Sequence, residues 1–143
     1  MIEVTEERKK LLKDDMQRLL KEWQKRLFLQ DWIINLEMVD QSEILGKWGE
    51  NAFNWEGKWC NIRIAYPDEE NQSKTIKYLP ELTLVHELLH CKMNFLQPSD
   101  TYEGRYIDTC EHALLEELAK SLVMAKHGWT LEYFRNDEAR GTK

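Results

Sequence analysis

Five consecutive residues near the middle of the chain have the types and the spacing of a catalytic metal site. They form an H-E-x-x-H motif, His86-Glu87-Leu88-Leu89-His90. Residues four apart on an α-helix lie one above the other on the same face, so both imidazoles can reach one metal ion. The glutamate between them then approaches a water molecule that the ion holds. The spacing predicts a metal site with His86 and His90 as ligands and Glu87 close to the bound water.

The motif needs a helix, and the residues around it are typical of one. Pro80 suits the first helical position, Glu81 complements the helix dipole there, and apolar residues between 82 and 89 form the body. A chain with 4 histidines and 18 glutamates contains such a motif by chance roughly once in seventy cases. The alternative is a partly buried helix whose two histidines hydrogen-bond to backbone carbonyls. The helical context favours the metal site.

Length and composition indicate one globular domain, residues 1–143. Hydrophobic residues make up 42% and charged residues 32% of the chain, the usual proportions of a soluble globular protein. Six tryptophans add large apolar surfaces, which a compact fold buries. No apolar run reaches the length of a membrane span, and residues 1–10 lack the apolar core of a secretory signal. We therefore expect a cytoplasmic protein without a membrane segment.

Net charge and cysteine content indicate whether nucleic-acid binding and disulfide bonds are expected. The formal net charge of −6 gives no strong signal for nucleic-acid binding. Cys60, Cys91 and Cys110 are an odd number without C-x-x-C spacing, so reduced thiols are expected and not a disulfide scaffold. Cys91 and Cys110 adjoin candidate metal ligands, but packing as small apolar residues is the favoured interpretation.

The hydrophobic pattern predicts a helix, three strands and two further helices. The N-terminal helix carries apolar residues at three- and four-residue steps. We expect it to pack on the core, and a partner-binding or substrate-gating role is the alternative. The strands alternate, for example Ile62 and Ile64 against Asn61 and Arg63. The predicted helices are 5–29, 79–95 with the motif, and 108–126; the predicted strands are 32–39, 47–55 and 59–66. This order predicts an α+β fold.

A catalytic zinc site takes three protein ligands and a water molecule, so a third ligand must come from outside the motif. The last helix is the natural source, because a short loop, which contains Tyr102 and Tyr106, returns it beside the motif helix. The candidates on this helix are Glu111, His112, Glu116 and Glu117. His112 and Glu116 lie together on the flank of the expected core face, and Glu117 points nearer to solvent.

A helical wheel selects one of these candidates. Leu115, Leu118 and Leu122 define the expected core face, and Glu111 lies on the same line. A carboxylate on an apolar face is costly unless it is paired or binds a metal. Glu111 is therefore the predicted third ligand, and the two flanking candidates stay open as alternatives. A candidate that does not bind the metal could orient a residue that does.

The motif, the strands before it and the helix after it together resemble a known family. Two strands, T-L-V-H-E-L-L-H at 83–90, a loop and E-H-A-L-L-E-E-L-A at 111–119 resemble the zincin-type metallopeptidases, in particular the gluzincin arrangement with a glutamate on a following helix. More narrowly, the chain resembles small metallopeptidases encoded by phages and prophages, which are little more than a minimal zincin core. The specific part covers residues 59–123.

Within this resemblance, His86, Glu87 and His90 correspond to ligand, general base and ligand. The last helix lacks the E-x-x-x-D and E-A-N contexts of better-marked families, so the third ligand carries over less directly. Met93 and Leu96 stand where the extended motif H-E-x-x-H-x-x-G-x-x-H has glycine and histidine, which disfavours a metzincin.

The resemblance implies a zinc-dependent peptidase acting on a protein or peptide. Zn²⁺ lowers the pKa of its bound water and polarises the scissile carbonyl, and Glu87 moves a proton from that water to the leaving amine. Zincins commonly hold an extended peptide against an edge strand, for which the strand at 61–65 is the candidate and an ordinary sheet strand the alternative. Tyr102, Tyr106 and His127 are available as oxyanion-stabilising donors, and their spacing selects none of them.

Two other functions compete with this one. The first is a non-catalytic zinc-binding interaction protein of a phage or prophage, in which the same ligands stabilise the fold. The second is a relation to metallopeptidases that act in DNA repair or cleave repressors. The weak basic content argues against direct DNA binding.

Overall fold

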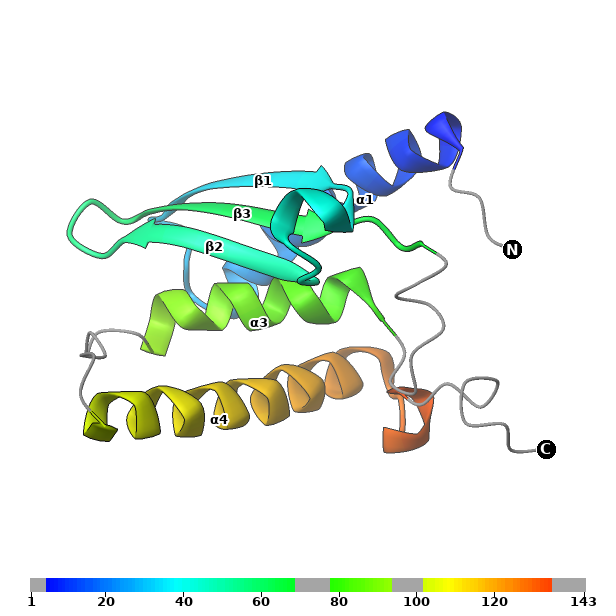
Figure 1. Ribbon diagram of the computed structural model, residues 1–143. Helices are drawn as coiled ribbons and strands as arrows, with labels where there is room; N and C mark the ends of the chain where they lie inside the picture. Colours follow the sequence, from blue (N-terminus) through cyan, green and yellow to red (C-terminus); the bar gives the residue numbers. More distant parts are fainter. Residues whose placement is uncertain (1–4, 69–77, 94–101, 135–143) are drawn as a thin grey trace.

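The computed structural model describes residues 5–68, 78–93 and 102–134 (Figure 1). Its longer elements are the helices α1 (Glu6–Arg26), α3 (Pro80–Met93) and α4 (Tyr102–His127) and the strands β1 (Ile33–Val39), β2 (Gly49–Asn54) and β3 (Trp59–Ala65). Two 3-10 helices, η1 (Gln41–Ile44) and η2 (Leu131–Phe134), follow β1 and α4. Helices and a small mixed sheet confirm the predicted α+β fold.

Helix α1 is amphipathic and packs on the core, as its periodicity predicts. The Thr5 side chain accepts a hydrogen bond from a backbone N–H of the first turn, which caps the helix. Met16, Leu20 and Trp23 are buried at steps of three and four residues. The helix ends three residues earlier than predicted, because Phe28 adopts a left-handed backbone conformation with φ of 56° and turns the chain toward β1.

The sheet has the order β1-β3-β2, so β3 is its central strand. β3 pairs in parallel with β1 and antiparallel with β2. The prediction that residues 61–65 form a peptide-binding edge strand is therefore wrong, because this strand is hydrogen-bonded on both sides. Pairing between strands distant in sequence decides which strand lies at an edge, and alternation within one strand does not reveal it.

Helix α3 lies between the sheet and α4, which explains its burial (Figure 1). Cys60, Ile62 and Ile64 of β3 are buried beneath the sheet, and Asn61 and Arg63 point to the other face, as predicted. Eight residues of α3 are buried: Leu82, Leu84, Val85, Glu87, Leu88, Leu89, His90 and Cys91. Two of these are polar, and both belong to the H-E-x-x-H motif.

Helix α4 begins at Tyr102, six residues before the predicted start at position 108. Tyr102 and Tyr106 thus belong to the helix and not to a loop, since Gly104 does not interrupt it. The predicted end of α3 at position 95 and the polar residues 97–101 lie outside the described residues. The buried stripe of α4 is Leu115, Ala119 and Val123, whereas Leu118 and Leu122 are only partly buried.

Gly49 allows β2 to approach α3 closely. A Cβ at this position would lie 2.5 Å from Thr83 Cγ2, too close for two carbon atoms, and 3.6 Å from Glu87 Cγ. We expect Gly49→Ala to destabilise the protein by about 1–3 kcal/mol, because the strand or the helix must shift. Chemical denaturation measures this loss. Thr83→Ser removes the obstructing methyl group and should restore most of the stability of Gly49→Ala; equal stability of the single and double variants would contradict this explanation.

Candidate metal centre

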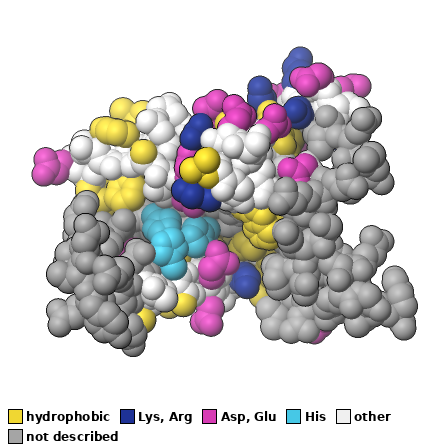
Figure 2. Space-filling view, in the orientation of Figure 1, with side chains coloured by type: hydrophobic (Ala, Val, Ile, Leu, Met, Phe, Trp, Pro, Cys, Tyr) yellow, Lys and Arg dark blue, Asp and Glu magenta, His cyan; other side chains and the backbone are white. Residues whose placement is uncertain are grey.

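Three histidine side chains from two helices come together beside the sheet. His86 and His90 lie one turn apart on α3, and His112 lies on α4. One nitrogen from each ring can be chosen so that all three lie within 4.8 Å of one another. The ring centroids are 4.9 to 5.8 Å apart. Figure 2 shows histidine side chains gathered in one place on this face, with acidic side chains beside them. The three histidines could bind a metal ion.

The rotation of α4 decides which of its residues reaches this centre. Because Leu115 and Ala119 form the buried stripe, the flank that carries His112 and Glu116 faces α3 near the motif. The helical wheel defined the core face of this helix by Leu115, Leu118 and Leu122, and it did not include Ala119. Alanine buries without a large apolar side chain, so composition alone understates its place in the core.

Each of the other candidate ligands has a definite place. Glu111 Oε1 lies 3.9 Å from His90 Nδ1, and Glu116 Oε1 lies 2.8 Å from His86 Nδ1. Glu117 is exposed, as predicted. The structure brings Glu111 beside His90, but the residue of α4 grouped with His86 and His90 is His112. Glu111 as a direct ligand stays a prediction.

His86 carries an unsatisfied polar atom. Its Nδ1 is buried and forms no hydrogen bond of good geometry within the described part of the chain, although Glu116 Oε1 lies 2.8 Å from it. Burial alone would lower the pKa of His86, but the carboxylates of Glu116 and Glu87 outweigh burial and raise the pKa above its usual value. The close imidazole in turn lowers the pKa of Glu116. The pair is therefore electrostatically coupled.

The carboxyl group of Glu87 is buried. Only 7% of the residue is exposed, and burial raises its pKa from 4.5 to about 7. Asn51 Nδ2 donates one hydrogen bond to Glu87 Oε2 at 2.7 Å and another to the backbone oxygen of Glu87 at 3.2 Å. This contact was not predicted from the sequence. The two-residue period of a strand could have indicated it, because the polar residue Asn51 shares the inner face of β2 with Gly49 and Phe53.

The chemistry of this donor set fits a transition metal. Neutral imidazole nitrogen is a common ligand of zinc, copper, iron and nickel. A tetrahedral zinc site places its nitrogen ligands about 3.4 Å apart, so the rings need only small rotations to close on an ion. A bound ion would also determine which nitrogen of His86 carries the proton, and so the tautomer of this buried ring. The residues present therefore fit a metal, and the geometry does not select which one.

A pocket of about 180 Å³ opens beside the centre. Its walls are the apolar parts of Trp48, Leu82 and Thr83, and its polar lining comes from α4 and the motif. The eight lining residues are Trp48, Gly49, Leu82, Thr83, His86, Glu87, Glu116 and Lys120. A group that enters this pocket therefore lies next to both the cluster and the buried carboxyl group.

Of the candidate oxyanion donors, the structure describes the side chain of His127, which lies far from the centre. His127 lies about 22 Å from His112 along the axis of α4, since the rise is about 1.5 Å per residue. Its Nε2 contacts Glu81 Oε1 at 2.7 Å, and its ring stacks on Trp129. The side chains of Tyr102 and Tyr106 lie outside the described residues.

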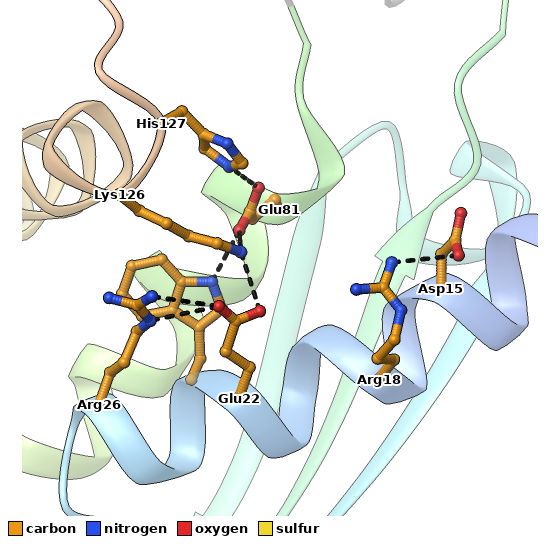
Figure 3. A network of polar contacts seen from close by, with 8 residues as sticks. Asp15, Arg18, Glu22, Arg26, Glu81, Lys126 and His127 are labelled. Carbon is orange, nitrogen blue, oxygen red and sulfur yellow. Dashed lines mark hydrogen bonds and ion pairs between the residues drawn. The ribbon is translucent and has the colours of Figure 1, made fainter.

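A polar network joins the three helices at the far end of α4 (Figure 3). Lys126 Nζ donates to Glu81 Oε2 at 2.5 Å and to Glu22 Oε2 at 3.0 Å, and Trp23 Nε1 donates to Glu81 Oε2 at 2.8 Å. Burial would raise the pKa of Glu81, but hydrogen bonds from Lys126, Trp23 and His127 outweigh it and lower the pKa. The network sets the position of α4 relative to α3.

We expect Lys126→Met to lower the free energy of unfolding at pH 7 by about 1–3 kcal/mol, because charged hydrogen bonds to Glu81 are lost. The lowered pKa of Glu81 means that this stabilisation is present above pH 4.5 and disappears as the pH falls through the folded-state pKa. The variant should therefore lose less stability than the wild type on acidification. Arg18→Met is the matched control, because Arg18 and Asp15 form an exposed pair, and a stability change of about 0.5 kcal/mol or less is expected.

A comparison of the chain with models of protein families, with curated proteins and with solved structures found no match in any of the three. Within the described residues, no helix combines the length and the apolar character needed to cross a membrane. Inferences about activity therefore depend on the motif and on the geometry around it.

Proposed function

We propose that the chain is a zinc-dependent metallopeptidase with a minimal zincin-like fold, in which His86, His90 and His112 hold the metal and Glu87 is the general base. One observation carries this proposal: three imidazole nitrogens lie within 4.8 Å of one another beside a buried carboxyl group. A surface cluster of histidines would not need such a neighbour. A hydrolytic metal site needs both parts.

Zinc held by three imidazoles supplies a Lewis acid and lowers the pKa of water toward neutrality. The protein contributes the proton acceptor. In the metal-free protein burial raises the pKa of Glu87 to about 7, and a bound cation would lower this pKa and favour the carboxylate. The carboxylate can take a proton from water and return it to a leaving amine. Its burial limits exchange of that proton with bulk water.

Glu111 and Glu116 support the proposed ligands from outside. Each carboxylate lies next to the Nδ1 atom of one motif histidine, at 3.9 Å for His90 and at 2.8 Å for His86. Carboxylates in this position orient ligating imidazoles and make them more basic. Glu111 therefore has a proposed role even when His112 is the third ligand.

A peptide substrate would lie along β2. This outer strand passes Glu87 through the contact with Asn51, and its side away from β3 pairs with no described strand. An extended peptide could add to this edge by main-chain hydrogen bonds. The pocket lined by Trp48 and Leu82 would then receive a substrate side chain next to the reacting bond.

The alternative is a zinc-binding interaction protein without catalysis. The observation that favours it is that the histidine cluster joins α3 to α4, so a bound ion would hold two packed helices together. The peptidase requires Glu87 as its general base, whereas the interaction protein does not require it. A cytoplasmic location and a protein or peptide as the substrate stay predictions from the sequence.

The proposed function is tested by removal and return of the metal. Purified protein is stripped with a chelator, its metal content is measured, and cleavage of a broad peptide library is followed by mass spectrometry. We expect cleavage that disappears with the metal and returns with one equivalent of Zn²⁺. Protein that binds one equivalent of zinc and cleaves no member of the library would favour the interaction protein.

A further inference from the structure

Asn51 makes the most specific contact to Glu87 that the structure describes. Its Nδ2 atom donates to Glu87 Oε2 at 2.7 Å and to the backbone oxygen of Glu87 at 3.2 Å. A side-chain amide carries two N–H groups, so one nitrogen can serve both acceptors. The backbone oxygen only accepts, so the NH₂ side of the amide, and not its oxygen, must face Glu87.

This contact restrains a buried and otherwise flexible side chain. Only 7% of Glu87 is exposed, and glutamate has three rotatable side-chain bonds. The hydrogen bond from Asn51 holds Oε2, so rotation of the carboxyl group is restricted. A proton acceptor works only when it lies within hydrogen-bond reach of the proton, so an error of about 1 Å in its place can cost about 100-fold in rate.

We propose that Asn51 is a positioning residue that holds the carboxylate of Glu87 in its reactive orientation. The inference rests on the proposed peptidase function. It assigns to an outer strand of the sheet a part in orienting the general base, in addition to any contact with substrate.

A purely structural role for Asn51 makes a different prediction. The same hydrogen bonds could serve only to attach β2 to α3. Yet β2 already lies against α3 at Gly49, where the backbone is too close to Thr83 to admit a Cβ atom. Loss of the amide should therefore leave the strand in place and release the carboxylate.

The test compares three variants in the full-length, zinc-loaded protein. Asn51→Leu keeps the size and shape of the side chain but removes the donor, and Asn51→Gln keeps an amide donor on a longer stem. Asn35→Leu is the matched control, because Asn35 lies on β1 and its Nδ2 donates a hydrogen bond to Asn61 Oδ1 on the exposed face of the sheet. Metal content, kcat and KM are measured for each.

We expect Asn51→Leu to lower kcat by roughly 10- to 100-fold with unchanged KM and metal content. Asn51→Gln should recover part of this loss, and Asn35→Leu should change kcat less than about twofold. A kcat for Asn51→Leu equal to that of the wild type would overturn the proposal. So would a loss that appears only in KM or in metal content, because that pattern belongs to substrate binding or to structural support.

A second measurement does not depend on turnover. The infrared carboxylate bands of Glu87 are isolated in the metal-free protein at pH 9 by subtracting the spectrum of a Glu87→Gln variant in each background. Loss of the Asn51 donor should shift these bands, and unchanged bands would overturn the positioning role. If the zinc-loaded wild type cleaves nothing while the bands shift, the peptidase function fails and the hydrogen bond to Glu87 stands.

Discussion

Glu87→Gln should abolish peptide cleavage while leaving the metal and the fold in place. The amide has nearly the same shape as the carboxyl group and can still accept the hydrogen bond from Asn51. It cannot take up a proton, and a positioned general base contributes typically about 10²- to 10⁴-fold to the rate. We expect kcat/KM to fall by at least about 10²-fold, as measured on any peptide that the wild type cleaves.

The matched control for this variant is Glu37→Gln. Glu37 lies on β1, is exposed, and points to the face of the sheet that carries Arg63. The same chemical change there should leave kcat/KM within about twofold of the wild type, because an exposed carboxylate away from the site contributes little. Full activity of Glu87→Gln, with one equivalent of bound metal, would remove Glu87 from the mechanism.

Glu87→Gln should also change how stability depends on pH in the metal-free protein. The folded-state pKa of Glu87 is about 7, above the ordinary value of 4.5, so the native state retains a proton that the unfolded chain releases. The stability that this group contributes is present below pH 4.5 and is lost as the pH rises to about 7, by roughly 3 kcal/mol. Glu87→Gln removes this loss, so its advantage over the wild type should grow between pH 5 and 8. Denaturation midpoints at several pH values measure it.

His112→Ala should remove most of the metal affinity of the protein. The nitrogen of His112 is the one contribution of α4 to the cluster of three, and two imidazoles on one helix hold zinc weakly. We expect a loss well above 100-fold, whereas Glu111→Ala and Glu116→Ala should each lose about 10- to 100-fold, the usual effect of removing a carboxylate that orients a ligand. Competition with a chromophoric chelator measures all three affinities at one pH.

The same variants separate the two candidates for the third ligand. If Glu111→Ala loses the metal and His112→Ala keeps it, Glu111 is the ligand, as the helical wheel predicted. Thermal unfolding provides a second readout, because a ligand that binds only the folded state raises Tm. Zn²⁺ should raise the Tm of the wild type and have little effect on His112→Ala.

The local features of the site could be predicted from the sequence because they depend on spacing within one element. Two histidines four residues apart on a helix must share a face, and Glu87 between them must lie close by. The alternation of Ile62 and Ile64 with Asn61 and Arg63 gave the faces of β3 correctly for the same reason. The short predicted connection indicated that the last helix lies beside the motif helix, and α4 does pack against α3.

The errors concern arrangements between elements. The strand at 61–65 could not be identified as central from its own alternation, since its neighbours β1 and β2 are set by pairing across the chain. The start of α4 was placed at position 108 because Asp108 and Thr109 resemble caps, yet the helix continues through them from Tyr102. Local capping signals are weak beside the packing of a long helix.

The sequence by itself determined the α+β order of elements, the helix that carries the motif, and the positions of His86, Glu87 and His90 on it, because these follow from periodicities of a few residues. The tertiary structure alone decided that His112 completes the cluster, that Glu111 and Glu116 each lie beside one motif histidine, and that Asn51 reaches Glu87. These contacts depend on the rotation of α4 and on the approach of β2 to α3. Both are set by packing of small residues, Ala119 in one case and Gly49 in the other, which leave little trace in a hydrophobic pattern.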